Sequence, residues 1–138
     1  MEEIYVEFPA NLKYLHLATS LCRILCEVLQ QSRIRPGLQE DMELCVSEAC
    51  TNAILHGSRT VPESKVFLRF LVDREQVIVH VGDQGRGFDL NQVPSPDLES
   101  YPEQGLGLFI IRSKMDRVRY VRGESENYLE MIKYYGEE

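Results

Sequence analysis

Residues 4–31 change from the spacing of a strand to the spacing of a helix. Hydrophobic and polar side chains alternate over residues 4–8, which predicts a half-buried opening strand that ends at Pro9. From Asn11, a favourable N-cap, to about Gln31, apolar residues recur at helical spacing. These positions are Leu12, Leu15, Leu21, Leu25, Val28 and Leu29. We therefore expect a first amphipathic helix in this segment.

A second helix is predicted from about Leu38 to His56. Pro36 and Gly37 separate it from the first helix, and Gly57 is placed to end it. Its apolar face consists of Met42, Cys45, Val46, Ala49, Cys50 and Ala53. The four cysteines, at 22, 26, 45 and 50, lack the paired spacings of a zinc ribbon. We expect them to be reduced thiols that fill the core.

The second half of the chain is dominated by strands. Residues 65–72 and 76–81 are β-branched and aromatic runs joined by three polar residues, which predicts an antiparallel hairpin. A polar segment punctuated by glycine and proline follows. A third helix is expected after Gly105, to about Met115, and a closing hairpin over residues 117–134 turns around Gly123.

The expected order is strand, two helices, two strands, helix, two strands. Because the strands come in hairpins, we expect a mostly antiparallel mixed sheet, and three helices of this length can cover only one of its faces. The sequence thus predicts an α/β (α+β) two-layer sandwich. No repeat or long linker divides the chain, so residues 1–138 are expected to form one domain.

Composition narrows the classes of function. The chain has 43% hydrophobic and 27% charged residues, which is typical of a soluble globular protein. A formal net charge of -7 would repel a phosphate backbone, so nucleic acid is not expected as a partner. No apolar run approaches the roughly 20 residues that cross a bilayer, and the acidic start is unlike a secretory signal. We expect a cytoplasmic protein that does not bind membranes.

The first residues that could carry chemistry lie on the second predicted helix. Glu48, Asn52 and His56 are four residues apart and form one polar stripe beside the apolar face. The amide oxygen of Asn52 is a suitable ligand for Mg²⁺, and the carboxylate of Glu48 could accept a proton or hold a water. By itself, such a stripe is more often a solvated helix face.

Two segments with glycines follow farther along the chain. Asp83 ends a strand and precedes Gly85 and Gly87, so a sharp turn holds its carboxylate where it could accept a hydrogen bond from an amine such as that of adenine. The Gly-Leu-Gly sequence at 105–107 opens the third helix, whose free N–H groups and partial positive charge suit phosphates. Taken singly, each segment is also compatible with an ordinary glycine-rich turn.

In this order and at these separations, the motifs resemble those of the GHKL ATPase and kinase superfamily. Residues 48–52 look like its N box, residues 83–87 like its first glycine box and residues 105–107 like its second, with the ATP lid between the two glycine boxes. Residues 43–57 and 105–116 are specifically similar to the branch of bacterial anti-sigma factor serine kinases. The resemblance spans nearly the whole chain and implies a Bergerat-type ATP-binding fold.

The resemblance implies an ATP-dependent protein-serine/threonine kinase. Asp83 would bind the adenine amino group, Asn52 would coordinate Mg²⁺ at the phosphates, and Glu48 would act as general base on the attacking hydroxyl. The residues expected to shape the nucleotide pocket and lid are Gly85, Gly87, Gly105, Leu106, Gly107 and Leu108. Members of this branch phosphorylate a small antagonist protein of the STAS type, hold a sigma factor inactive when that antagonist is absent, and often form homodimers.

The chain departs from the family pattern in two places. Family members often have an arginine or similar group near the lid, whereas residues 89–111 contain no Lys or Arg. Neutralising the phosphates would then fall to Mg²⁺, the helix terminus, Arg86, Arg112 or Lys114. The family also commonly has a threonine near the start of the last strand, where Asn127 could hydrogen-bond instead.

Two other functions stay open. A nucleotide-dependent partner-binding switch of the same fold would bind ATP without transferring phosphate. The catalytic domain of a histidine kinase is the other alternative, but the chain has no second region with a phosphorylatable histidine. His16, on the first helix, lacks the acidic neighbour expected of that role and is read as a surface residue.

Overall fold

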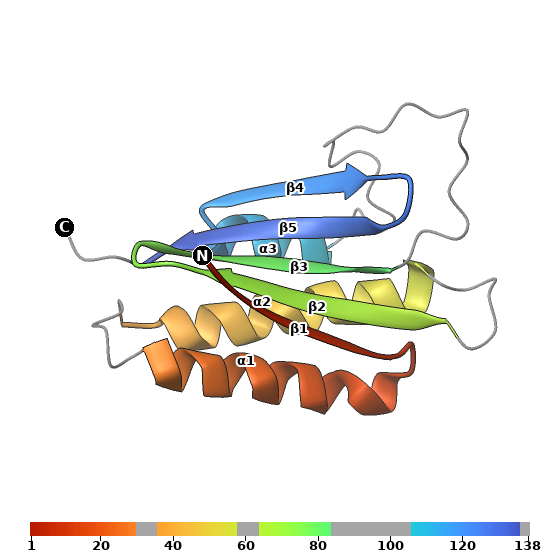
Figure 1. The fold of residues 1–138 in the computed structure, drawn as a ribbon, viewed down its shortest axis with the longest axis horizontal. Coiled ribbons are helices and arrows are strands. Elements are labelled where there is room, and N and C mark those ends of the chain that lie inside the picture. Colours follow the sequence, from red (N-terminus) through yellow and green to blue (C-terminus); the bar gives the residue numbers. More distant parts are fainter. Residues whose placement is uncertain (30–35, 58–63, 84–105, 136–138) are drawn as a thin grey trace.

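The computed structural model describes residues 1–29, 36–57, 64–83 and 106–135, and Figure 1 shows how the elements are arranged. Along the chain these elements are β1 (Glu2–Pro9), a 3₁₀ turn (Leu12–Tyr14), α1 (Leu15–Leu29), α2 (Leu38–Asn52), a π-helical turn η3 (Ala53–Gly57), β2 (Lys65–Val72), β3 (Gln76–Asp83), α3 (Leu106–Lys114), β4 (Arg117–Arg122) and β5 (Asn127–Tyr134). This is the order of strands and helices that the sequence predicts.

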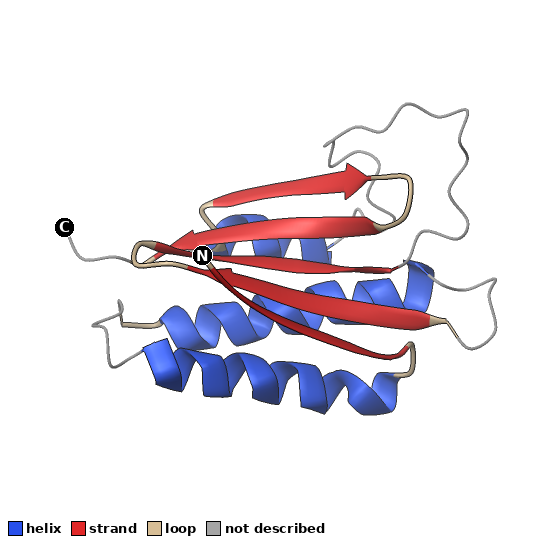
Figure 2. Ribbon diagram, viewed as in Figure 1, coloured by secondary structure: helices blue, strands red, loops and turns tan. Residues whose placement is uncertain are grey.

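The described strands form one five-stranded sheet in the order β1-β2-β3-β5-β4. The sequence predicts a mostly antiparallel mixed sheet, and every described strand pair is in fact antiparallel. Figure 2 shows the helices together on one side of the sheet, and none of the described helices covers the other face. The predicted two-layer α/β sandwich is therefore confirmed.

The core lies between the helices and the sheet. The predicted apolar face of α2 is buried, and all four cysteines are buried free thiols, as expected. The largest fully buried side chains on the helix-facing side include Met42, Leu68, Phe70, Ile111, Leu129 and Met131. His16 is exposed, as the sequence predicts, and its ring lies 3.4 Å from the hydroxyl of Ser20.

The buried face of α1 differs from the apolar spacing in the sequence. Val28 and Leu12 share that spacing, yet they are 59% and 48% exposed. The buried residues of α1 are Ala18, Cys22, Leu25, Cys26 and Leu29. Small side chains allow close packing of two helices, and α1 packs against α2. The small residues thus face α2, and Val28 is turned to the solvent.

The ends of the first two helices follow from local chemistry. The Oδ1 atom of Asn11 accepts a hydrogen bond from the main-chain N–H of Lys13 at 2.9 Å and caps the 3₁₀ turn before α1. Gly37 precedes α2 with a φ of +85°, a left-handed conformation that favours glycine. Regular α-helix ends at Asn52 and not at the predicted His56, because the chain continues as the wider turn η3.

The described helices are too short or too polar to cross a lipid bilayer. The longest of them, α1 and α2, have 15 residues each. None of the described helices has the length and apolar character that a membrane span requires.

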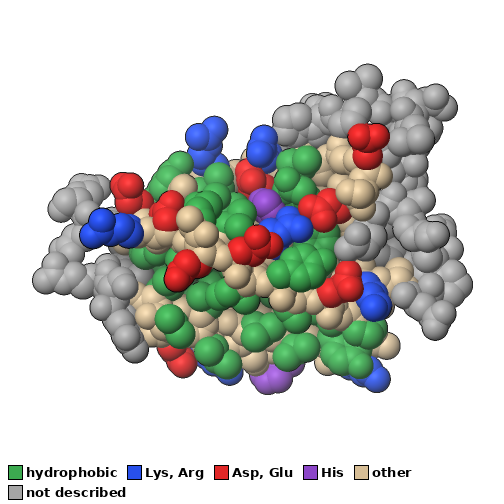
Figure 3. Space-filling model, in the orientation of Figure 1, with side chains coloured by type: hydrophobic (Ala, Val, Ile, Leu, Met, Phe, Trp, Pro, Cys, Tyr) green, Lys and Arg blue, Asp and Glu red, His purple; other side chains and the backbone are tan. Residues whose placement is uncertain are grey.

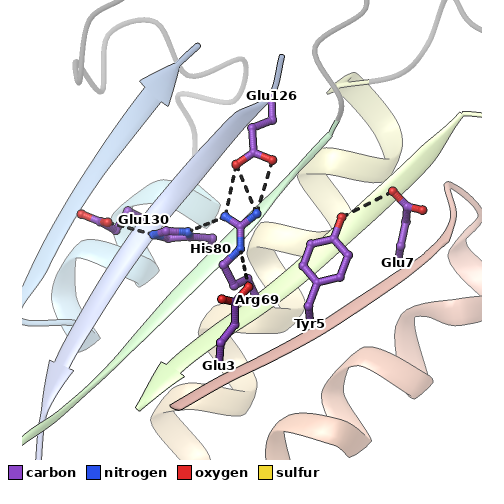
Figure 4. Close-up of polar contacts among 7 residues, drawn as sticks. All are labelled: Glu3, Tyr5, Glu7, Arg69, His80, Glu126 and Glu130. Atoms are coloured by element: carbon purple, nitrogen blue, oxygen red, sulfur yellow. Dashed lines mark hydrogen bonds and ion pairs between the residues drawn. The ribbon is translucent and has the colours of Figure 1, made fainter. Parts of the chain in front are cut away.

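A row of directly paired residues crosses the helix-free face of the sheet, one from each strand: Tyr5, Arg69, His80, Glu130 and Arg119. Figure 4 shows His80 between Arg69 and Glu130, with each ring nitrogen 2.9 Å from its partner. Because a guanidinium group can only donate, His80 accepts at Nδ1 and donates its Nε2–H to Glu130. Glu130 also accepts a hydrogen bond from Arg119 at 2.6 Å.

This row helps to fix the strand register on which the functional residues depend. Figure 3 views the helix-free face, where charged side chains gather near the centre among hydrophobic ones. The pairing of His80 with Glu130 belongs to the same ladder that places Asp83 opposite Asn127. Because a slip of one residue turns a whole strand over, a slip of β5 against β3 would disrupt both pairings.

Acid is expected to weaken the fold through Glu130. Chiefly the hydrogen bond with His80 lowers the pKa of the Glu130 carboxyl from 4.5 to about 2. Since the pKa is lower in the folded chain, ionised Glu130 stabilises the fold fully above pH 4.5, and this contribution is lost as the pH falls toward 2. It amounts to at most about 3 kcal/mol.

Denaturant unfolding between about pH 2 and pH 6 checks this expectation. The difference in free energy of unfolding between the wild type and Glu130→Gln should shrink as the pH is lowered through this interval. A difference that stays constant with pH would contradict it.

Candidate functional site

The C-terminal half of α2 carries two of the predicted site residues, one turn apart. Glu48 is half-buried, and Asn52, the last residue of the helix, is only 5% exposed. The Oδ1 atom of Asn52 has no hydrogen-bond partner within the described part of the chain. Because an unsatisfied buried acceptor costs about 1–3 kcal/mol, this arrangement is typical of a site that a ligand completes.

Glu48 lies against the first turn of α3. A Cβ atom added to Gly107 would lie 2.9 Å from Oε1 of Glu48, so the absence of a side chain leaves room for the carboxylate. The first turn of a helix also presents main-chain N–H groups and a partial positive charge. The structure thus brings together Glu48 and Gly107, two of the predicted site residues.

Asp83 ends β3 on the side of the sheet that faces the helices. Val79 and Val81 are buried in the core, and the alternation along the strand turns Asp83 the same way. Both α2 and η3 pack against β3. In Figure 1, β3 ends at the same end of the molecule as α2, and α3 begins there. Asp83 is therefore at the same end of the sandwich as Asn52 and Gly107.

Asn127 begins β5 directly opposite Asp83. Its Oδ1 atom is another buried acceptor that lacks a partner in the described structure. Successive side chains on a strand alternate between its faces, so Asn127 shares the helix-facing side with the buried Leu129. A carboxylate and a carboxamide oxygen, both acceptors, therefore lie side by side at the edge of the site, and a donor such as an amine would suit them.

The negative charge of Asp83 also affects the pKa of Tyr120 on β4. Burial above all, and then the negative charge of Asp83, raises the pKa of the Tyr120 phenol to about 12. Arg122, which ends β4 opposite Asn127, opposes this rise. The sequence motifs do not single out Arg122, whereas strand pairing places it beside Asn127 at the candidate site. This position depends on strand pairing, which the local sequence does not reveal.

Gly82 is a second position that the sequence analysis missed. A Cβ atom there would lie 2.0 Å from the carbonyl oxygen of Asn127 and 2.6 Å from Cβ of Tyr128. The ring of Tyr128 in turn stacks on His80 at 4.1 Å between centroids. Only glycine permits this close approach of β3 and β5 next to Asp83. The available signal was a glycine inside a strand pattern.

Several predicted site residues cannot be placed or have a changed role. Gly85, Gly87 and Gly105 lie outside the described residues. Leu106 begins α3 with 72% exposure, whereas Leu108 is 5% exposed and belongs to the core. The side chain of Leu108 therefore packs against other residues, and only its main chain can contribute to a nucleotide site.

The described cations on α3 are not aimed at the phosphate end of the site. Lys114 forms an ion pair of 3.6 Å with Asp41 in the first turn of α2. At 1.5 Å per helical residue, Lys114 lies roughly 10 Å along α3 from Gly107. Arg112 is exposed, and Arg86 lies outside the described residues. Among the cations of α3, neither stands beside Glu48.

The chain is similar to known proteins of one family. A model of the histidine kinase-like ATPase domain family matches residues 8–133. The serine-protein kinase RsbW of Bacillus subtilis (strain 168) is 37% identical over 103 residues, which cover 69% of this chain and 64% of that protein. RsbW of Bacillus thuringiensis subsp. konkukian is 34% identical over 143 aligned positions, which cover 96% of this chain and 85% of that protein.

A solved structure supports the fold independently. The crystal structure of the RsbU and RsbW domains of a Mycobacterium tuberculosis protein matches the whole of this chain and 34% of that chain, with a TM-score of 0.67 and 15% identity. The match to the B. subtilis kinase spans slightly less than two thirds of that relative, at 64%. The resemblance based on the sequence motifs is confirmed, and the chain belongs to the histidine kinase-like ATPase domain family, in the branch that contains the RsbW serine-protein kinases.

Proposed function

We propose that the protein is an ATP-dependent protein-serine kinase that acts as an anti-sigma regulatory factor in the cytoplasm. The observation that carries this proposal is the buried, unsatisfied Oδ1 of Asn52, one helical turn from the contact between Glu48 and Gly107. The Oδ1 atom of Asn52, the carboxylate of Glu48 and the N-terminus of α3 are therefore next to one another. These are the groups that phosphoryl transfer from a nucleotide to a hydroxyl requires.

In this proposal the nucleotide lies between α2, α3 and the end of β3. Asp83 accepts a hydrogen bond from the adenine amino group, and the unsatisfied Oδ1 of Asn127 beside it accepts another from the base or from a bridging water. The main-chain N–H groups that open α3 lie toward the phosphates. The family resemblance assigns the shaping of the pocket and lid also to Gly85, Gly87 and Gly105, which lie outside the described residues.

Asn52 is the residue that would hold Mg²⁺. Its buried oxygen fits the preference of Mg²⁺ for hard oxygen ligands. Among the described residues there is no cluster of three or more His, Cys, Asp or Glu that suits a metal. When bound, the ion would neutralise charge on the phosphates.

Glu48 would act as the general base. Its carboxylate accepts the proton of the attacking serine hydroxyl while the bond from the serine oxygen to the γ-phosphorus forms and the bond from that phosphorus to the β,γ-bridging oxygen breaks. ADP leaves with the bridging oxygen. Gly107 keeps space for the Glu48 carboxylate at the start of α3, so the base and the phosphate-facing helix end are held next to each other.

The partners follow from the same family branch. The acceptor serine would be on a STAS-domain antagonist protein, and a sigma factor or analogous regulator would be bound when this antagonist is absent. A homodimer is the expected assembly. Incubating the protein with labelled ATP and its cognate STAS-domain protein tests the function directly: serine phosphorylation is expected, and an unlabelled substrate in the presence of bound nucleotide would refute it.

Asp83→Asn is expected to weaken ATP binding by about 10- to 100-fold. The substitution replaces a charged acceptor with an amide, and hydrogen bonds to charged groups contribute about 1.5–3 kcal/mol. Titration calorimetry of ATP with Mg²⁺ measures the effect. Glu75→Gln is the matched control, because it removes one exposed carboxylate at the opposite end of β3. Equal affinities for the two variants would contradict the assignment of Asp83.

A second candidate function is a nucleotide-dependent partner-binding switch without transfer. The observation that favours it is the ion pair of Lys114 with Asp41, together with the lack of Lys and Arg in residues 89–111. Phosphoryl transfer gains much from nearby cations. Under this alternative, ATP changes the affinity for the partner to the same extent in the wild type and in Glu48→Ala, and no label is transferred.

A further inference from the structure

The carboxylate of Glu126 is held by a guanidinium group from two strands away. Glu126 ends the turn between β4 and β5, directly before Asn127. Both Nη atoms of Arg69, on β2, donate hydrogen bonds to its carboxylate oxygens, at 3.2 and 3.3 Å. Because β3 lies between β2 and β5, this ion pair spans the strand that ends at Asp83 (Figure 4). It therefore ties the β4–β5 hairpin to β2 at the end of the sheet that carries the candidate site.

The guanidinium group of Arg69 is itself fixed on several sides. The Arg69 side chain is only 17% exposed, and its Nη1 also donates to Nδ1 of His80 at 2.9 Å. The guanidinium carbon lies 4.8 Å from the ring centroid of Phe67 and 5.4 Å from that of Tyr5, distances typical of cation–π contacts. A planar guanidinium group that cannot turn holds a bidentate carboxylate in one orientation.

The β4–β5 hairpin benefits from such a tie because it forms one edge of the sheet. Among the described strands, β4 pairs only with β5. The main-chain N–H of Gly123 donates to the carbonyl oxygen of Glu126 at 3.0 Å, which closes the turn on itself but does not attach it to another strand. Because Glu126 and Asn127 are consecutive, a turn that moves would also move the Asn127 oxygen away from Asp83.

We propose that Arg69 and Glu126 are positioning residues of the nucleotide site, which keep the Oδ1 atom of Asn127 beside Asp83. This inference rests on the proposed function, in which Asp83 and Asn127 recognise the adenine base. The ion pair lies on the helix-free face of the sheet, away from the nucleotide, so it acts only through Asn127. Without it, only a fraction of the molecules keep the binding-competent turn, and the affinity falls by that fraction.

Glu126→Ala tests the inference, with the adenine amino group as the probe. Titration calorimetry with Mg²⁺ compares the Kd for ATP with the Kd for purine riboside triphosphate, which lacks this amino group. The wild type should prefer ATP by about 10- to 100-fold, as expected for a hydrogen bond to a charged acceptor. In Glu126→Ala this preference should fall by about three- to tenfold, while the Kd for purine riboside triphosphate changes less than about twofold. Glu126→Gln, which keeps one acceptor for Arg69, should lie between the two.

Glu3→Ala is the matched control. It removes a carboxylate that contacts the same guanidinium group, 3.5 Å from Nε, but from β1 at the far edge of the sheet. The Glu3 side chain is 54% exposed, and exposed ion pairs contribute little, so the preference for ATP should stay within about twofold of the wild type.

Two results would overturn the inference. One is a preference for ATP in Glu126→Ala that equals the preference in Glu3→Ala. The other is an equal loss of affinity for both nucleotides in Glu126→Ala, because general damage to the fold does not depend on the amino group of the base. A wild type that binds neither nucleotide would instead refute the proposed function, on which the inference rests, so the two failures can be told apart.

Discussion

Glu48→Ala is expected to slow serine phosphorylation by about 10²- to 10⁴-fold, the usual contribution of a general base. Nucleotide binding should persist, because the groups proposed to hold ATP are Asp83, Asn52 and the start of α3. The effect should appear in kcat, since the proton is transferred only in the transition state. Single-turnover transfer from labelled ATP, with ATP affinity measured separately, checks both parts.

Glu40→Ala provides the control for Glu48. Glu40 is an exposed carboxylate two turns earlier on α2, so its removal changes the charge of the helix without touching Gly107. Transfer by Glu40→Ala should stay within about threefold of the wild type. The role of Glu48 as general base would be disproved by equal transfer rates in the two variants.

Gly82→Ala is expected to destabilise the fold by about 3 kcal/mol or more, at the upper end of overpacking effects. The added Cβ would lie 2.0 Å from a main-chain oxygen of β5, so a strand has to move rather than a flexible side chain. Because domains of this size are stable by about 5–15 kcal/mol, the loss should be large in denaturant unfolding. The midpoint should fall without a large change in slope.

Gly107→Ala is the contrasting variant for stability. There the added Cβ would lie 2.9 Å from the end of the flexible Glu48 side chain, which can turn away. Alanine is also a better helix former than glycine. Its free energy of unfolding should stay within about 1 kcal/mol of the wild type. If Gly82→Ala and Gly107→Ala were equally stable, the close approach of β3 to β5 would not be needed for the fold.

Local periodicity was sufficient to predict the elements and the buried side of α2, but not the whole buried side of α1. The alternation over residues 4–8 and the apolar face of α2 are short-range signals. The structure has the predicted strand and the predicted buried face of α2, but Ile4 on the apolar side of the strand is 45% exposed. The exposure of Val28 depends on how closely α1 packs against α2. Likewise, the end of regular helix at Asn52 arises from the wide turn that follows it, for which periodicity has no signal.

In the candidate site, too, the sequence motifs identify some residues, whereas other contacts become visible only in the folded structure. Glu48, Asn52 and Asp83 stand out in the sequence because their neighbours form family motifs. The partnership of Asp83 with Asn127 and the crowding at Gly82 arise from strand register. Register is set by pairing between segments far apart in the chain. A single sequence therefore identifies the acids of the site more readily than the residues that stand opposite them.

The four buried thiols give the molecule an internal reporter of how its helical layer opens. Burial raises the pKa of both Cys45 and Cys50 to about 12, and only the thiolate reacts readily with alkylating reagents. Labelling of these two cysteines therefore requires that the packing around each buried thiol first opens. The rate at which each cysteine is modified follows the frequency of this local opening, which makes breathing of the native state measurable without adding a probe.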